Sequence, residues 1–265
     1  MSRSIVHLSD LHFNKVDDAL IEPLIAAVEA LSPDFVAVSG DFTQHAYPIE
    51  FERAAELLKR LPGKHILVPG NHDMAFYNVW RRASQRLKLY KQYISDNMFP
   101  YYADADIAIL GLNTARVTHL RDGRIRSIQV DLLEKTMQSA PKSAVRVLVT
   151  HHPFDLPSTY AASELIGDRV FNRVVRCVDV MLAGHMHVSG AGPTASRYKV
   201  AGTSAVFVQA GTALSTRARG EPNGFQLICV EPSSIRVTAQ IWSGDAFVAG
   251  WTRAFIPGSQ GWSEV

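Results

Sequence analysis

Short apolar runs, each ending in polar residues that can bind a metal, alternate with amphipathic segments in the first part of this chain. The runs cover residues 5–9, 35–39 and 65–68, and the amphipathic segments cover residues 17–31 and 49–61. Helical spacing of apolar residues predicts a helix in each segment, and the runs predict buried strands. The resulting β-α-β-α-β order indicates an α/β fold, in which ligands bind beyond the carboxyl ends of parallel strands.

The later part of the chain first continues this alternation and then changes. Strands are expected at 107–112, 145–150 and 178–183, with helices at 127–139 and 168–175. The runs at 203–209, 225–230 and 235–242 have no helices between them, which predicts adjacent antiparallel strands of a second sheet. Because no linker, repeat or low-complexity tract interrupts the chain, residues 1–265 are expected to form a single domain.

Composition excludes several classes of protein. The chain has 265 residues, of which 47% are hydrophobic, so it can bury a large core. Its net charge of +2 argues against a nucleic-acid partner. No apolar stretch approaches the roughly 18 residues of a membrane span, and the apolar run at the N-terminus is too short for a signal peptide. We therefore expect a cytoplasmic protein without a membrane span.

Five short motifs stand directly after predicted strands. In chain order they are Asp10-Leu11-His12, Gly40-Asp41, Gly70-Asn71-His72-Asp73, His151-His152-Pro153 and Gly184-His185-Met186-His187. Each alone could be a polar surface turn, because Gly, Asn and Asp favour turns. Together they deliver carboxylate, imidazole and amide groups, which suit borderline divalent cations, to one edge of the fold.

These five motifs, in this order, resemble those of the calcineurin-like metallophosphoesterase family, and they span residues 10–187. The Asp-Leu-His opening and the compact size look most like the bacterial class III cyclic-nucleotide phosphodiesterase subgroup. The resemblance implies a four-layer α/β/β/α sandwich of two mixed β-sheets flanked by helices. It also implies two divalent metal ions, with Mn²⁺, Fe²⁺ or Fe³⁺ and Zn²⁺ as alternatives.

The resemblance assigns a role to each motif residue. Asp41 would bridge the two ions. Asp10, His12 and His187 would complete the shell of the first ion, and Asn71, His151 and His185 that of the second. A metal-bridging hydroxide would attack phosphorus. His72 would stabilise the transition state or protonate the leaving oxygen, and Asp73 would fix the tautomer of His72.

The expected substrates are small phosphodiesters, 3′,5′-cyclic nucleotides such as cyclic AMP among them. A phosphomonoesterase, a nucleotide-sugar or nucleotide-lipid pyrophosphatase, and less readily a nuclease, are alternatives at the same site. A scaffold that keeps the fold without metals is a hypothesis of another class, and the intact ligand set argues against it. A homo-oligomer is one alternative for the assembly.

Other residues are weaker candidates. The basic and aromatic segment 78–98 is expected to be a solvated helix, or else a cap over the substrate. Arg121, Arg124 and Arg126, and further on Arg217 and Arg219, could contact anions, or could be ordinary solvated side chains. His152 is expected to pack or to contact substrate, and His45 could line the pocket. His7, His65 and His119 are expected to be packed or surface residues.

Overall fold

The computed structural model describes residues 2–75, 79–117, 123–154, 168–196, 202–217 and 219–265. One sheet has seven strands in the order β13-β12-β11-β10-β1-β2-β3, in which β1, β2 and β3 run parallel and the other pairs are antiparallel. Its strands are β1 (Arg3–Leu8), β2 (Phe35–Val38), β3 (Lys64–Leu67), β10 (Gly224–Glu231), β11 (Ser234–Trp242), β12 (Phe247–Gly258) and β13 (Gly261–Glu264).

The second sheet has six strands in the order β4-β5-β6-β7-β9-β8, with a parallel centre and an antiparallel strand at each edge. Its strands are β4 (Tyr101–Ala103), β5 (Ile107–Gly111), β6 (Val145–Val149), β7 (Val180–Ala183), β8 (Gly190–Pro193) and β9 (Val206–Gln209). The parallel strands are buried on both faces, which explains their continuous apolar sequences.

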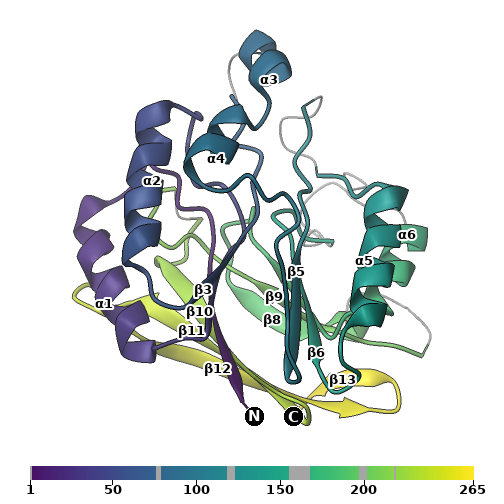
Figure 1. Cartoon of the computed structure of the whole chain (residues 1–265). Coiled ribbons are helices and arrows are strands. Elements are labelled where there is room, and N and C mark those ends of the chain that lie inside the picture. Colours follow the sequence, from purple (N-terminus) through teal and green to yellow (C-terminus); the bar gives the residue numbers. More distant parts are fainter. Residues whose placement is uncertain (1, 76–78, 118–122, 155–167, 197–201, 218) are drawn as a thin grey trace.

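Helices cover the outer faces of both sheets. The α-helices are α1 (Ile21–Leu31), α2 (Pro48–Arg60), α3 (Val79–Gln85), α4 (Lys88–Tyr93), α5 (Ser127–Ser139) and α6 (Asp168–Val175), with short 3-10 helices at Asp18–Leu20 and Thr194–Ser196. In Figure 1, α1 and α2 lie on one side of the molecule and α5 and α6 on the other, with the sheets between them. The expected four-layer α/β/β/α arrangement is confirmed.

The side chains of each strand point alternately to the two faces of its sheet, and this alternation produces the layers. On β1, Ile5 faces the core between the two sheets, whereas Val6 and Leu8 face the core beneath α1 and α2. On β5, Ile109 and Leu110 divide in the same way between the inter-sheet core and the core beneath α5 and α6. Successive side chains of a strand point to opposite faces, so each parallel strand contributes to two apolar layers.

Two expectations from the sequence were wrong. Of the C-terminal runs, β10 and β11 pair antiparallel as expected, but they do not form a sheet with β9: β10 also pairs antiparallel with β1, and β9 joins the second sheet parallel to β7. The basic segment is not one solvated helix. Arg86, with a φ of 46°, separates α3 from α4, and Arg82 of α3 is buried. Apolar periodicity identifies a strand or helix without specifying its neighbour.

Candidate metal centre

All seven residues expected to bind metal lie just beyond the carboxyl ends of parallel strands. Asp10 and His12 follow β1, Asp41 follows β2, Asn71 follows β3, His151 follows β6, and His185 and His187 follow β7. These strands belong to both sheets, and their ends meet at the same edge of the sandwich. The structure brings the seven side chains together there, and six are buried while His185 is partly exposed.

Asp10, His12 and His187 form a first group. The Oδ1 atom of Asp10 lies 3.2 Å from Nε2 of His187 and 3.6 Å from Nε2 of His12. The two imidazole nitrogens are 3.1 Å apart. Bonds of about 2.0–2.2 Å from a cation to such atoms place neighbouring ligand atoms about 3 Å apart, so this spacing fits one ion.

Asn71, His151 and His185 form a second group. Nε2 of His151 lies 3.1 Å from Oδ1 of Asn71 and 3.3 Å from Nδ1 of His185. The three residues come from β3 of one sheet and from β6 and β7 of the other. Their amide and imidazole atoms, at this spacing, fit a second cation.

Asp41 lies between the two groups. Its Oδ2 atom is 3.4 Å from Nε2 of His151 in the second group and 3.7 Å from Nε2 of His12 in the first. A carboxylate so placed can contact two ions at once, and its negative charge offsets the repulsion between them. Asp41 has the position that a bridging ligand requires.

In both Asp10 and Asp41, one carboxylate oxygen accepts hydrogen bonds from the protein and the other faces the centre. Oδ2 of Asp10 accepts hydrogen bonds from the backbone N–H of His185 at 2.8 Å and from the hydroxyl of Ser9 at 2.6 Å. Oδ1 of Asp41 accepts one from the backbone N–H of His72 at 2.8 Å. The remaining oxygen, Oδ1 of Asp10 or Oδ2 of Asp41, faces the imidazoles, and Oδ1 of Asp10 is buried without a hydrogen bond.

Backbone carbonyls set the tautomers of two histidines. Nδ1 of His151 lies 2.7 Å from the carbonyl oxygen of Ser39, and Nδ1 of His187 lies 3.0 Å from that of Arg217. Because a carbonyl can only accept, Nδ1 carries the hydrogen in both rings. Nε2 of both rings therefore faces the centre and, once deprotonated, offers its lone pair to a cation, as a metal ligand requires.

The backbone is strained at five of the seven residues. Positive φ angles occur at Asp10 (52°), His12 (49°), Asp41 (53°), His185 (71°) and His187 (56°). Such angles are uncommon for residues other than glycine, and they cluster at functional sites, where the surrounding structure enforces them. Here each one turns a side chain back over the end of its strand.

Neighbouring glycines let these turns approach one another. A Cβ added at Gly40 would lie 2.7 Å from Nδ1 of His151, and one added at Gly184 would lie 2.5 Å from Oδ2 of Asp10. At Gly70 an added Cβ would collide with the Asp41 carboxylate. Glycine in these motifs permits close packing of loops from different strands.

The centre contains strong opposing electrostatic effects. Burial acts to raise the pKa of the Asp41 carboxyl, but the charges of His151 and His72 outweigh it and hold that pKa below its ordinary value. Burial acts to lower the pKa of His151, whereas Asp41 raises it to about 9. Burial lowers the pKa of His185 to about 3. The carboxylate thus stays ionised, which favours cation binding.

His72 borders the centre without belonging to either ligand group. One of its ring nitrogens lies within 4.8 Å of ligand atoms of His12 and Asp41. Nδ1 lies 2.8 Å from the carbonyl oxygen of Gln44, and Nε2 lies 3.4 Å from Nη1 of Arg217. Burial lowers the pKa of His72 to about 4. The carbonyl of Gln44 places the hydrogen on Nδ1 and leaves Nε2 toward the centre.

The role expected for Asp73 was wrong in one respect. Its Oδ2 atom accepts from the backbone N–H of Gly70 at 2.8 Å, and its Oδ1 atom accepts from the N–H and hydroxyl of Thr43 at 3.0 and 3.1 Å. Burial, and then the charge of Asp41, raises its pKa to about 8. Asp73 therefore joins the loops after β2 and β3, while the Gln44 carbonyl holds the His72 ring.

Arg82 was not singled out from the sequence and is part of the support. It is 1% exposed, and its Nη1 atom donates to the carbonyl of Asn71 at 3.0 Å. Its Nε and Nη2 atoms donate to the carbonyls of Val117 and Arg116 at 2.9 and 2.6 Å. These three acceptors are backbone atoms, so no side-chain pattern in the sequence could have revealed these contacts.

The remaining candidates are distributed around the centre. Nδ1 of His152 lies 2.7 Å from the hydroxyl of Thr114, and its ring packs against His151 and His185. His45 is half-buried and lies next to Asn14. Nε2 of His65 and Nε2 of His7 contact the Leu61 carbonyl and the Ser39 hydroxyl, Arg219 is exposed, and His119 and Arg121 lie outside the described residues.

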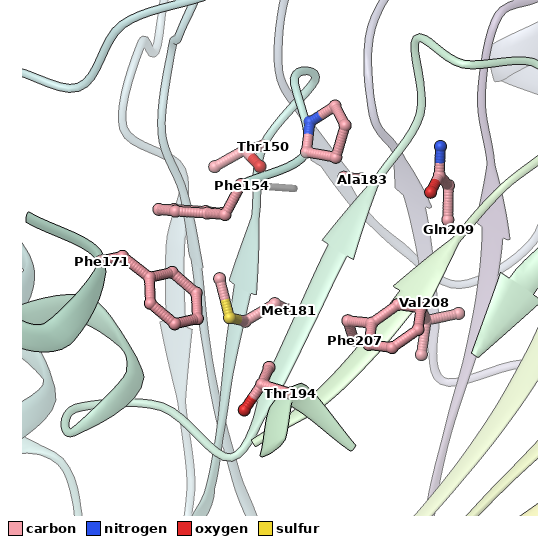
Figure 2. Close-up of a pocket in the computed structure, with 10 residues that line it drawn as sticks. Thr150, Phe154, Phe171, Met181, Ala183, Thr194, Phe207, Val208 and Gln209 are labelled. Atoms are coloured by element: carbon pink, nitrogen blue, oxygen red, sulfur yellow. The ribbon is translucent and has the colours of Figure 1, made fainter. Parts of the chain in front are cut away.

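An apolar pocket behind the His151 turn is not the site. Figure 2 shows its walls, with Phe154 and Phe171 on one side and Phe207 and Val208 on another, around Met181. Its lining is apolar apart from Thr150, Thr194 and Gln209, and none of the residues expected to bind metal lines it.

The two groups of candidate ligands, with Asp41 between them, form a cluster that could bind metal ions on an α/β/β/α scaffold. The sequence model of the calcineurin-like phosphoesterases matches residues 3–189. The chain belongs to the calcineurin-like phosphoesterase family, and it is a phosphoric ester hydrolase. The resemblance seen in the sequence is thereby confirmed.

Two similar proteins have names that match the subgroup suggested by the sequence motifs. The chain is 26% identical over 207 residues to the 3′,5′-cyclic adenosine monophosphate phosphodiesterase CpdA of Escherichia coli, a match that covers 69% of each chain. It is 27% identical over 165 residues to a protein of Synechococcus named probable cyclic nucleotide phosphodiesterase, and the match spans 58% of this chain and only 59% of that protein.

Structural similarity extends over nearly the whole chain. The purple acid phosphatase PPD1 of yellow lupin (Lupinus luteus) superposes with a TM-score of 0.72 and 13% identity, covering 95% of this chain and 53% of the phosphatase. This similarity shows the shared fold. Across the part of the chain that the structure describes, no helix is long and apolar enough to cross a membrane.

Proposed function

We propose that this chain is a two-metal phosphodiesterase that hydrolyses small phosphodiesters, with 3′,5′-cyclic nucleotides such as cyclic AMP as the leading substrate class. One observation carries the two-metal part of the proposal: Oδ2 of Asp41 lies between two separate groups of ligand atoms. The names of the relatives support the phosphodiesterase reaction and the cyclic-nucleotide class.

Seven side chains would hold the ions. Asp10, His12 and His187 would bind one, Asn71, His151 and His185 the other, and Asp41 both. This mixture of carboxylate, amide and imidazole suits Mn²⁺, Fe or Zn²⁺. Bound ions of this type activate water as a nucleophile and neutralise charge on phosphoryl oxygens.

His72 and Arg217 would act on the substrate itself. Their nitrogens, 3.4 Å apart, can both reach one phosphoryl group. Arg217 would neutralise a phosphoryl oxygen, and its Nη1 atom is held 3.1 Å from Oε1 of Gln44. The Gln44 carbonyl accepts the Nδ1 hydrogen, so Nε2 of His72 faces the site, where it would stabilise the transition state or, in the protonated ring, donate a proton to the leaving oxygen.

Asp73 would contribute indirectly. It ties the Gly70 turn to Thr43, and these loops carry Asn71 and Asp41. We count it as a positioning residue, in place of the tautomer-fixing role expected from the sequence.

Hydrolysis of a panel of phosphoesters by the Mn²⁺-loaded protein tests this function. We expect turnover of bis-p-nitrophenyl phosphate and of cyclic AMP, and slower turnover of the monoester p-nitrophenyl phosphate. Absence of turnover of any diester, with two Mn²⁺ bound, would contradict the proposal. Faster turnover of the monoester would favour the phosphomonoesterase alternative.

The setting of the enzyme completes the proposal. We propose a cytoplasmic location and a small-molecule substrate, since a net charge of +2 gives no support for a nucleic-acid substrate. A homo-oligomer stays an alternative, which light scattering of the purified protein would decide.

A further inference from the structure

A polar pocket opens beside the α3–α4 connection, and none of the candidate metal ligands lines it. It has a volume of about 560 Å³ and is formed by four segments of the chain. Arg86 comes from the α3–α4 connection, Phe99 from the segment before β4, Arg116 from the loop after β5, and Arg124 and Arg126 from the approach to α5. The sequence indicated Arg124 and Arg126 as possible anion contacts.

The charged side chains that line this pocket, called the arginine pocket below, are all positive. Four of its ten described lining residues are arginines, and none of the ten is acidic; Asn113 and Gln129 are the neutral polar ones. Four arginines thus line one space in a chain whose net charge is only +2. A bound anion would be attracted to them, and the planar fork of arginine matches phosphoryl oxygens in pairs.

Hydrogen bonds fix the backbone that carries these arginines. The N–H of Arg124 donates to the carbonyl of Thr114 at 2.9 Å. The N–H of Arg126 donates to Oε1 of Gln129 at 3.0 Å, and Nε2 of Gln129 donates to the carbonyl of Asn113 at 2.8 Å. The two walls of the pocket are thus held together, so less ordering is required when a ligand binds.

The start of α5 adds to the positive potential. Ile128 and Gln129 of its first turn line the pocket, and α5 has 13 residues. The N-terminal end of a helix of this length carries a partial positive charge that favours anions. The helix end and the arginines therefore act in the same direction.

Apolar side chains stand next to the arginines. Phe99 is 40% exposed and Ile128 is 73% exposed, and both line the pocket. An exposed aromatic ring beside guanidinium groups suits a ligand that combines an anionic group with a flat apolar body. We propose that the arginine pocket binds a nucleoside phosphate, with the phosphoryl group on the arginines and the base against Phe99.

This site is separate from the metal centre but adjoins it. None of the seven residues expected to bind metal lines the pocket. The loop after β5 lies between the two: its Thr114 hydroxyl is 2.7 Å from Nδ1 of His152, while its Arg116 lines the pocket. Arg82 links the carbonyls of Arg116 and Asn71. The proposal therefore does not depend on which ester the metal centre hydrolyses.

AMP serves as the probe, titrated by calorimetry into the Mn²⁺-loaded full chain. We expect the double variant Arg124→Gln/Arg126→Gln to bind one AMP fewer per chain than the wild type, or to bind it at least tenfold more weakly. The control Lys142→Gln/Arg236→Gln removes the same charge from exposed positions outside this pocket and should bind as the wild type does. Circular dichroism verifies that both variants are folded.

Hydrolysis of bis-p-nitrophenyl phosphate separates this site from the metal centre. The Arg124→Gln/Arg126→Gln variant should keep wild-type turnover of this diester. Unchanged AMP stoichiometry and affinity in that variant would overturn the proposal. Loss of diester turnover together with AMP binding would also overturn it, because the arginines would then serve the metal centre.

The aromatic part of the proposal has its own test. Phe99→Ala should weaken AMP binding several-fold while leaving the affinity for inorganic pyrophosphate unchanged. Equal affinities of Phe99→Ala and the wild type for AMP would show that the pocket takes a bare phosphoryl anion and would contradict the assignment to nucleoside phosphates.

Discussion

The two sheets contribute different kinds of side chain to the candidate metal centre. The seven-stranded sheet supplies both carboxylates and the amide, through Asp10, Asp41 and Asn71, together with one imidazole. The six-stranded sheet supplies imidazoles alone, from His151, His185 and His187. Neither ligand group belongs to a single sheet, so the centre exists only where the two sheets are packed in register.

Support for the ligands differs in the same way. The carboxylates on the first sheet are held by N–H groups, one of which comes from His185 on the other sheet. The imidazole of His151 on the second sheet is held by a carbonyl of the first, that of Ser39. Both carboxylates therefore come from one sheet, and the tautomer of His151 is set by the other sheet. This comparison makes Asp41 the residue whose loss should matter most.

The largest effect is expected for Asp41→Ala, which removes the shared carboxylate. We expect metal analysis after Mn²⁺ loading to find neither ion, and diester turnover to fall by at least about 100-fold, since even outer-shell partners of metals matter by 10–100-fold. The measurements are elemental analysis and hydrolysis of bis-p-nitrophenyl phosphate.

His187→Ala is the matched variant on the other sheet. It belongs to one ligand group only, so this protein should retain one of the two ions. If Asp41→Ala retains two ions, or if both variants lose the same number of ions, Asp41 does not bridge. The first sheet would then not supply a ligand shared by both ions.

The proximity of the seven candidate ligands was predictable from the sequence, and the atoms that support them were not. Each of the seven follows an apolar run, and parallel strands align such ends at one edge. The atoms that orient them are backbone carbonyls of Ser39, Gln44 and Arg217, which leave no trace in the order of side chains. Asp73 was assigned to His72 because it is adjacent in sequence, whereas its partners are Gly70 and Thr43.

The same limit applies to the fold. The parallel strands and helices α1, α2, α5 and α6 were expected because apolar residues recur at the required spacing. The strand β12 was not expected, because most of its residues are exposed and it lacks a regular apolar face. The place of β10 beside β1 depends on long-range pairing, such as that of Arg3 with Val230, which local periodicity does not encode.

His72→Ala should give the next largest effect, and it separates chemistry from metal binding. His72 is in neither ligand group, so both ions should stay bound. We expect turnover of cyclic AMP to fall by about 10²–10⁴-fold, the usual contribution of a positioned proton donor. Turnover of bis-p-nitrophenyl phosphate should fall less, because p-nitrophenolate leaves without protonation. Equal losses for the two substrates, or full activity, would contradict a role in protonating the leaving oxygen.

Gly40→Ala should have the smallest effect on turnover per folded molecule and a large effect on stability. Gly40 is where the first sheet meets His151 of the second: its φ is 92°, and an added Cβ would lie 2.7 Å from the His151 ring and from the backbone N of Gly70. We expect a loss of about 3 kcal/mol in the free energy of unfolding, from the left-handed backbone and the collision together.

Gly244→Ala is the control, because its φ of 111° is also positive and nothing lies within 4 Å of the added Cβ. That variant should lose only about 1 kcal/mol in the free energy of unfolding, measured by urea unfolding. If Gly40→Ala and Gly244→Ala lose the same free energy of unfolding, the backbone conformation alone explains Gly40, and close contact between the sheets at this point does not constrain the centre.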